Sequence, residues 1–364
     1  MPLGEKEKSK NLANARSGKA SYSLPELDQL ERLIARGEKF LRVSVLTTVC
    51  DASGKQYPVY LLQLGSDSAT APALSFIGGI HGVERIGSQV IMAYLETLIE
   101  RLRWDKALQE KFESVSLYAI PIVNPLGMKN NTRSNGNGVD LMRNAPIDSD
   151  EKVTFLPGGH RISRKLPWFR GDINGGMEKE LQVLYDFIKA QQSTRPFLLT
   201  LDCHSGFGLN DRVWFPYARS RKPIKTLGLY YRLYRLFDKA YRNHSFYEFE
   251  PQCRHYITHG DVWDLLYDEA LISSSERVFL PLTLEMGSWL WVKKNPRQLF
   301  RFHSIFHPMV PHRHERILRR HYPLFDFLLS ATLNYQEWPR RSEQKKKRDD
   351  KAALKRWFGG WKKP

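Results

Sequence analysis

Short β-rich runs alternate with stretches whose apolar residues recur at helical spacing, and this alternation restricts the fold more than any other feature of the sequence. Strands are predicted over residues 42–49, 58–64, 73–77, 115–122, 197–202, 212–216 and 280–285, and helices over 84–103, 177–190, 224–241, 260–271 and 321–334. Strand, helix and strand in succession indicate an α/β fold, with a twisted, mostly parallel sheet covered by helices on both faces. Closely spaced strands near the start predict that part of the sheet is antiparallel.

Positive charge is concentrated at the two ends of the 364-residue chain, whose formal net charge is +17. Residues 1–20 hold five lysines and arginines against two glutamates, and residues 339–364 hold eleven against three acids. We therefore expect two basic, flexible and disordered tails around one folded domain over residues 21–338. The C-terminal tail has the charge to contact nucleic acid or an anionic surface, but such tails do not by themselves identify a nucleic-acid-binding protein.

The sequence pattern gives no sign of a membrane span or an export signal. No window holds the roughly 18 uninterrupted apolar residues that a spanning helix needs. The first twenty residues lack the apolar stretch of a secretory signal. The three cysteines, Cys50, Cys203 and Cys253, are too few and too scattered for a disulfide framework. We therefore expect no transmembrane segment and a reducing, cytoplasmic location.

An H-x-x-E pair, His81 and Glu84, follows the predicted strand ending in ALSFI. Two glycines turn the chain there, and a helix is predicted to begin at Glu84, where helix N–H groups favour a carboxylate. Open α/β sheets bind ligands beyond the C-terminal ends of their strands, so this pair is a candidate metal site. The second H-x-x-E match, His312 and Glu315, lies in a basic run between prolines and is interpreted as a solvated surface.

Two further strand ends carry groups suited to metal-assisted hydrolysis. His204 follows the apolar run 197–201 and is a candidate third ligand, although a core or turn histidine would give the same pattern. The neighbouring Cys203 points to the opposite face of a strand and is interpreted as a packed apolar residue. Glu285 ends another apolar strand and is a candidate general base, or an interior glutamate paired with an arginine.

Residues 124–176 are rich in Asn, Gly, Pro and Arg and are too long for a simple connection. Arg133 and Arg143 lie in an otherwise nearly uncharged part of this stretch. An arginine can bind a carboxylate through two hydrogen bonds or stabilise a developing oxyanion. Each arginine taken alone is equally compatible with an ordinary surface position.

Together, these motifs resemble, in their order and local sequence, the zinc carboxypeptidases of the M14 metallopeptidase family, the carboxypeptidase A type. The matching positions are His81 and Glu84 in H-x-x-E, Asn124 to Gly127 in N-P-x-G, Arg133, Gly138 to Asn144 in G-V-D-x-x-R-N, His204, Tyr256 with Gly260, and Glu285. The resemblance spans about residues 58–290. It implies an α/β/α sandwich around a mixed, mostly parallel sheet, with the catalytic domain over residues 21–338.

The resemblance also implies a role for each matched side chain. One Zn²⁺ per chain would be held by His81, Glu84 and His204, with Asp140 orienting a zinc histidine. Glu285 would be the general base, Arg133 would polarise the scissile carbonyl, Arg143 and Asn144 would bind substrate, and Tyr256 would serve both catalysis and binding.

One departure from the family pattern concerns substrate recognition. The family usually has asparagine before the carboxylate-binding arginine, and here that place holds Met142, which cannot hydrogen-bond a carboxylate. Seven residues beyond Tyr256 lies Trp263, with Asp261 nearby. A large aromatic predicts a shallow or apolar specificity pocket, whereas Asp261 would accept a basic side chain, and the sequence does not choose between them.

Three function classes follow from these observations. The leading hypothesis is a zinc metallocarboxypeptidase that hydrolyses the C-terminal bond of a peptide with a free carboxylate. The nearest alternative is a related zinc deacylase or amidase acting on an N-acyl amino acid or a cell-wall-type peptide. A basic binding protein whose tails contact nucleic acid or membrane is a different class, which predicts salt-sensitive binding and no need for zinc.

Overall fold

The computed structural model describes residues 23–244, 246–273, 277–289, 310–339 and 342–360, together with residues 293, 306 and 308. The predicted N-terminal tail, residues 1–20, lies outside the described residues. Within them, the chain forms a mixed eight-stranded sheet in the order β1-β2-β4-β3-β5-β8-β6-β7. The strands are β1 (Arg42–Cys50), β2 (Gln56–Gly65), β3 (Ala73–Gly78), β4 (Ser116–Ile120), β5 (Phe197–Ser205), β6 (Asp211–Phe215), β7 (Tyr247–Pro251) and β8 (Val278–Met286).

The directions of the strands confirm the predicted mixture. β1, β2 and β4 pair antiparallel in succession, whereas β4, β3, β5 and β8 run parallel through the centre of the sheet. Every residue of β3 and β5 is buried, as expected for central strands covered on both faces. Because β3, β5 and β8 are parallel, their C-terminal ends meet at one edge. In the register of β5 and β8, His204 lies opposite Glu285.

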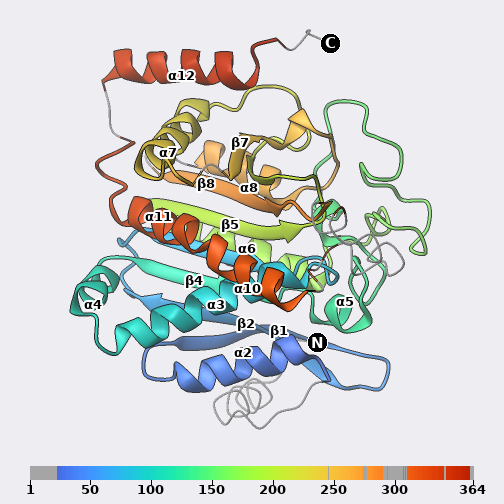
Figure 1. Cartoon of the computed structure of the whole chain (residues 1–364). Helices are drawn as coiled ribbons and strands as arrows, with labels where there is room; N and C mark the ends of the chain where they lie inside the picture. The colour runs from blue at the N-terminus through green and yellow to red at the C-terminus, as the bar shows by residue number, and fades with distance from the viewer. Residues whose placement is uncertain are drawn as a thin grey trace.

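Helices cover both faces of the sheet, as the strand–helix alternation predicted (Figure 1). The helices are α2 (Pro25–Arg36), α3 (Arg85–Leu102), α4 (Lys106–Glu113), α5 (Pro125–Asn130), α6 (Lys179–Thr194), α7 (Leu227–Ala240), α8 (Val262–Ser273), α10 (Pro311–Arg320), α11 (Tyr322–Leu333) and α12 (Glu343–Trp357). α3, α10 and α11 lie in front of the sheet in Figure 1, and α6 and α8 lie behind it. Two apolar clusters fill the spaces between the layers, one on each face.

Helix α3 packs directly against the backbone of β5. A Cβ atom on Gly87 would lie 2.2 Å from the carbonyl oxygen of Cys203, so only glycine permits this approach. The contact brings the start of α3, and with it Glu84, beside the end of β5, where His204 lies. Cys203 itself is buried in the apolar cluster, as its opposite orientation on the strand predicted.

The expectation that residues 339–364 form a disordered tail is wrong for the described part, because residues Glu343–Trp357 form helix α12. Asp349, Ala353 and Trp357 recur at helical spacing on one face, and this face packs on α7 (Figure 1). Asp349 forms a 2.6 Å ion pair with the buried Arg232, and the Trp357 indole donates a 2.6 Å hydrogen bond to the carbonyl of Phe249. In the sequence, Asp349 contributed only to the charge count, whereas in the structure it binds α12 to the rest of the domain.

Helix length and hydropathy bear on the membrane prediction. No helix in the described part of the chain combines the length and the apolar character that a membrane span requires.

Candidate metal centre and substrate cavity

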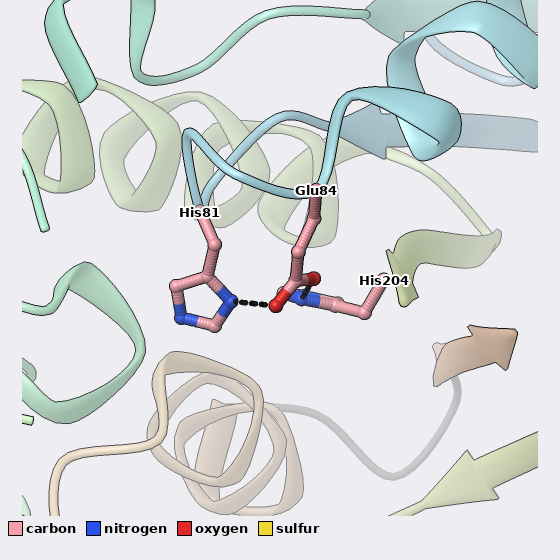
Figure 2. Close-up of side chains that lie close together, drawn as sticks. All are labelled: His81, Glu84 and His204. Carbon is pink, nitrogen blue, oxygen red and sulfur yellow. Dashed lines mark hydrogen bonds and ion pairs between the residues drawn. The ribbon is translucent and has the colours of Figure 1, made fainter. Parts of the chain in front are cut away.

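Three side chains from two strand ends converge at the C-terminal edge of the sheet. His81 and Glu84 lie on the turn between β3 and α3, and His204 lies near the end of β5 (Figure 2). Nδ1 of His81 is 2.9 Å from one Glu84 carboxylate oxygen, and Nδ1 of His204 is 2.9 Å from the other. One ligand atom from each residue lies within 4.8 Å of the others, and all three side chains are buried.

The far nitrogens of both imidazoles are held by buried carboxylates. Nε2 of His81 lies 3.0 Å from Asp140, as the resemblance implied, and Nε2 of His204 lies 2.7 Å from Asp202. Sequence reasoning missed Asp202, although its position two residues before His204 on a strand places both side chains on one face. Asp202 also accepts a 2.8 Å hydrogen bond from the indole of Trp263.

This arrangement fits a divalent metal. With Nε2–H donated to a carboxylate, each Nδ1 carries a lone pair that faces an oxygen of Glu84. Electron-pair donors 2.9 Å apart repel each other unless a proton or a cation lies between them. Two imidazoles and one carboxylate are the donor set of several catalytic zinc sites.

The charges around the cluster keep its carboxylates ionised. Burial alone would raise the pKa of Glu84, but its interactions with the imidazoles of His81 and His204 outweigh burial and lower it. Burial likewise opposes ionisation of Asp140, whose pKa is nevertheless held well below its usual range, chiefly by Arg133. A carboxylate must be deprotonated to bind a metal, and these groups satisfy that condition.

Arg133 lies between the two acids of this cluster. Its Nε donates a 2.8 Å hydrogen bond to Asp140, and its Nη1 lies 3.2 Å from Glu84. The guanidinium is 17% exposed and borders the cavity, so it can also reach a bound group.

Glu285 lies near the C-terminal end of β8 and borders the cavity. It is opposite His204 on the neighbouring strand β5. Its carboxylate accepts a 3.0 Å hydrogen bond from the backbone N–H of Phe207. Burial, reinforced by repulsion from Glu84, raises the pKa of Glu285 to about 8. A carboxylate with a raised pKa is a stronger base than an exposed one, which suits a group that accepts and returns a proton.

These side chains open onto one cavity of about 420 Å³. Its wall contains seven of the nine predicted site residues: His81, Glu84, Arg133, Arg143, His204, Tyr256 and Glu285. The remaining wall is largely apolar and was not predicted; its main members are Pro157, Trp168, Phe207, Trp214 and Phe306. This lining favours a ligand with an apolar or aromatic group.

Arg143 is a buried cation on this wall, 3% exposed. It donates hydrogen bonds to the carbonyls of Pro157 and Met142, and among the described residues no carboxylate forms an ion pair with it. Its backbone carbonyl would lie 1.9 Å from a Cβ atom on Gly260, which has a φ of +71°. Glycine is therefore needed at position 260 for the segment after Tyr256 to pack against Arg143.

Tyr256 lies beside Arg143, whose guanidinium carbon is 6.0 Å from the centroid of the phenol ring. The ring also packs against Phe207 and Trp214, at centroid distances of 5.7 and 5.9 Å. Removal from water raises the pKa of Tyr256 to about 12, so its hydroxyl remains a proton donor at neutral pH.

The side chain of Asn144 does not have the substrate-binding position that the resemblance implied. Its side chain donates to the carbonyls of Arg170 and Gly176 and accepts from the N–H of Glu178, so it holds loop backbone together. It is not among the residues that line the cavity.

The two candidate specificity residues also lie outside the cavity wall. Asp261 is buried and accepts the backbone N–H groups of Trp263 and Asp264 at the start of α8. Trp263 points to Asp202. Neither the basic-side-chain interpretation of Asp261 nor the pocket role of Trp263 is supported.

The second H-x-x-E pair does not form a comparable cluster. His312 and Glu315 lie exposed on α10. Within the described ranges, the only group of three or more potential metal ligands is His81, Glu84 and His204.

Comparison with known proteins places the chain in a family. The zinc carboxypeptidase family model matches residues 8–288. Carboxypeptidase E of Caenorhabditis elegans is 33% identical over 158 residues, which is 39% of this chain and 32% of that protein. Carboxypeptidase SOL1 of Arabidopsis thaliana is 28% identical over 93 residues, 25% of this chain and 19% of that protein. The chain thus spans a third or less of these two relatives.

A solved structure shows the same fold. Carboxypeptidase A from Helicoverpa armigera superposes with a TM-score of 0.62 and 16% identity, covering 90% of this chain and 80% of that one. At this identity the likeness concerns the fold, and it confirms the predicted α/β architecture.

Proposed function

Because the chain belongs to the zinc carboxypeptidase family, we propose that it is a metallocarboxypeptidase that hydrolyses the C-terminal bond of a peptide with a free carboxylate. The observation that carries this proposal is the buried Arg143 in the same cavity as the His81–Glu84–His204 cluster. A buried guanidinium without an acidic partner among the described residues is costly, and a substrate carboxylate would complete its interactions.

The metal requirement follows from the donor set. His81, Glu84 and His204 would hold one zinc ion. A zinc ion bound there would act as a Lewis acid on the scissile carbonyl and lower the pKa of a water molecule.

The remaining groups of the cavity would divide the proton and charge transfers among them. Glu285 would take the proton of the attacking water and deliver it to the leaving amine. Arg133 would stabilise the negative charge that develops on the carbonyl oxygen. Arg143 would bind the terminal carboxylate, and the Tyr256 ring would cover the bound end.

Met142 occupies the cavity wall where the family usually has an asparagine amide. Binding of the carboxylate then depends mainly on Arg143, and we expect simple dipeptides to bind about tenfold more weakly than they would with the amide present. The Met142→Asn variant should improve hydrolysis of blocked dipeptides with free C-termini.

The zinc deacylase or amidase alternative is supported by the apolar wall formed by Phe207, Trp214 and Trp168. Such a wall would accept an acyl group as readily as an aromatic side chain. The same catalytic groups would then cleave an N-acyl amino acid.

The test combines metal analysis with matched substrates. Purified protein should contain one zinc per chain and cleave blocked dipeptides with free carboxylates in preference to their amides. Arg143→Ala should raise KM at least about tenfold, whereas Arg133→Ala should chiefly lower kcat. Equal cleavage of acids and amides, unchanged by Arg143→Ala, would overturn the carboxypeptidase assignment and favour the amidase. Tight, salt-sensitive nucleic-acid binding without zinc or hydrolysis would favour the binding-protein class.

A further inference from the structure

Among the described residues, most of the exposed large apolar side chains lie on segments that also supply residues of the cavity wall. Of the ten that are exposed in the described chain, six lie on segments that border the cavity. They are Phe155 (75% exposed), Ile162 (63%), Leu166 (39%), Ile173 (79%), Leu209 (47%) and Trp289 (48%). We call the first four, all on the loop over residues 152–173, the apolar rim.

The loop that carries the apolar rim has two distinct sides. Its inner side lines the cavity through Thr154, Pro157, Pro167 and Trp168. Phe155 and Leu166 are direct sequence neighbours of these lining residues and face solvent. Figure 1 shows the loops between α5 and α6 beyond the C-terminal ends of the central strands, on the side of the molecule away from α4.

Hydrogen bonds fix the conformation of this loop. His160 pairs with Phe169 in an isolated β-bridge, and its imidazole lies 2.8 Å from the carbonyl of Pro167. The N–H of Gly158 donates to the carbonyl of Thr154 at 2.9 Å. The apolar side chains are therefore held outward by a structured loop that also builds the cavity wall.

The same loop is strongly basic. Residues 152–173 contain five lysines and arginines and a single acid, Asp172. Lys152, Arg161, Arg164 and Lys165 are exposed beside the apolar rim. Asp172 offsets only Arg164, through an exposed contact of 3.4 Å.

We propose that the apolar rim and its cations dock onto an anionic lipid surface, so that the cavity opens toward the membrane. Aliphatic and aromatic tips gain free energy when they enter the headgroup–acyl boundary, and neighbouring cations are attracted to anionic headgroups. Nucleic acid would use the cations but would leave Ile162 and Ile173 in water. The combination of both features on one loop fits lipid better.

Docking in this way selects the substrate class. A peptide or N-acyl amino acid that is anchored in the membrane would enter the cavity through its free carboxylate end, and Arg143 would bind that carboxylate. This consequence rests on the proposed function, whereas the docking itself is measured without turnover.

The experiment is cosedimentation of the full chain with vesicles of phosphatidylcholine alone or mixed with phosphatidylglycerol. We expect binding to the mixed vesicles, weakened by salt, and little binding to phosphatidylcholine. The Phe155→Ser/Ile162→Ser/Ile173→Ser variant should lose at least about tenfold in vesicle affinity. Its zinc content and thermal midpoint should remain unchanged, because the substituted side chains are exposed and do not line the cavity.

Trp104→Ser/Ile272→Ser is the matched control. Trp104, 71% exposed, follows α3, and Ile272, 86% exposed, lies at the end of α8. Both are at the edge of the sheet opposite the cavity. The control variant should bind mixed vesicles like the unchanged protein.

A charge variant, Arg161→Glu/Lys165→Glu, provides the second measurement and should also weaken binding to mixed vesicles. Failure of the unchanged protein to bind mixed vesicles would overturn the proposal. Binding that survives both rim variants but is lost in Lys345→Glu/Lys346→Glu/Lys347→Glu would equally overturn it, because α12 would then be the docking element. Loss of hydrolysis with docking intact would count against the proposed function alone.

Discussion

The carboxylates behind the two candidate ligand histidines predict a measurable difference in zinc affinity between two isosteric variants. In Asp202, a single oxygen, Oδ2, accepts from both His204 and Trp263, at 2.7 and 2.8 Å. The other oxygen, Oδ1, has no hydrogen-bond partner among the described residues. An asparagine at position 202 can therefore keep both hydrogen bonds by placing its amide nitrogen at the Oδ1 position.

Asp140 offers no such choice. Its Oδ1 accepts from His81 and from the N–H of Met142, each at 3.0 Å, and its Oδ2 accepts from Arg133 at 2.8 Å. Either orientation of an asparagine amide at position 140 opposes an NH₂ group to another donor. Asp140→Asn therefore removes a charge and also breaks at least one buried hydrogen bond.

Carboxylates that hold a metal-binding histidine contribute roughly 10- to 100-fold in metal affinity. We expect Asp202→Asn, which loses only the charge, to weaken zinc binding about tenfold, equivalent to about 1.4 kcal/mol. The additional donor–donor contact in Asp140→Asn costs on the order of 1–3 kcal/mol more. Its zinc affinity should therefore fall at least about fiftyfold.

The assay is competition for zinc between the protein and a fluorescent chelator, which reports affinity independently of turnover. Glu315→Gln, in the exposed H-x-x-E pair on α10, is the control and should leave the affinity unchanged. Equal losses in the two aspartate variants, or a larger loss in Asp202→Asn, would contradict the hydrogen-bond argument.

Further expectations concern catalysis, packing and pH. Glu285→Gln should retain zinc while kcat falls by roughly 10²–10⁴, as measured by metal analysis and steady-state kinetics; loss of zinc would show that Glu285 is a ligand or a structural residue. Trp357→Ala, which removes a side chain 2% exposed, should cost about 3–5 kcal/mol in chemical denaturation, and the exposed Lys355→Ala should change stability by less than about 0.5 kcal/mol. Equal effects of these two substitutions would show that α12 is not docked. Burial lowers the pKa of His321 to about 4, so the unfolded chain binds its proton first and stability should fall as pH decreases from about 6.5 to about 4. His321→Gln should flatten this part of the pH–stability curve.

Elements with a complete apolar pattern could be predicted from the sequence, and those held by polar contacts could not. Every residue of the run 197–202 is buried and four of the six are apolar, and the strand was predicted correctly within a few residues of its end. Helix α12 was missed because only Ala353 and Trp357 are buried on it, and the third contact of that face is made by an acid, Asp349. Its docking depends on Arg232, more than a hundred residues earlier, and no local pattern contains that partner.

The metal cluster was predictable because its geometry follows from the sheet. Parallel strands end at a common edge, so His81, Glu84 and His204 were expected to converge once each was placed beyond a strand. Prediction of Asp202 as the partner of His204 required one more step of reasoning. Alternation along β5 places both side chains on the same face, and this signal was available in the sequence.

The positions of the two candidate specificity residues could not be predicted because side-chain direction at the start of a helix is set by local hydrogen bonds, which motif spacing does not encode. Asp261 accepts the first N–H groups of α8, and this position turns Trp263 toward Asp202. A residue counted as a specificity determinant therefore supports the carboxylate behind His204. Part of the cavity wall is formed instead by the inner side of the loop over residues 152–173, which has little periodicity and whose outer side carries the apolar rim. Because the apolar rim faces away from the cavity, membrane docking can be tested separately from substrate binding.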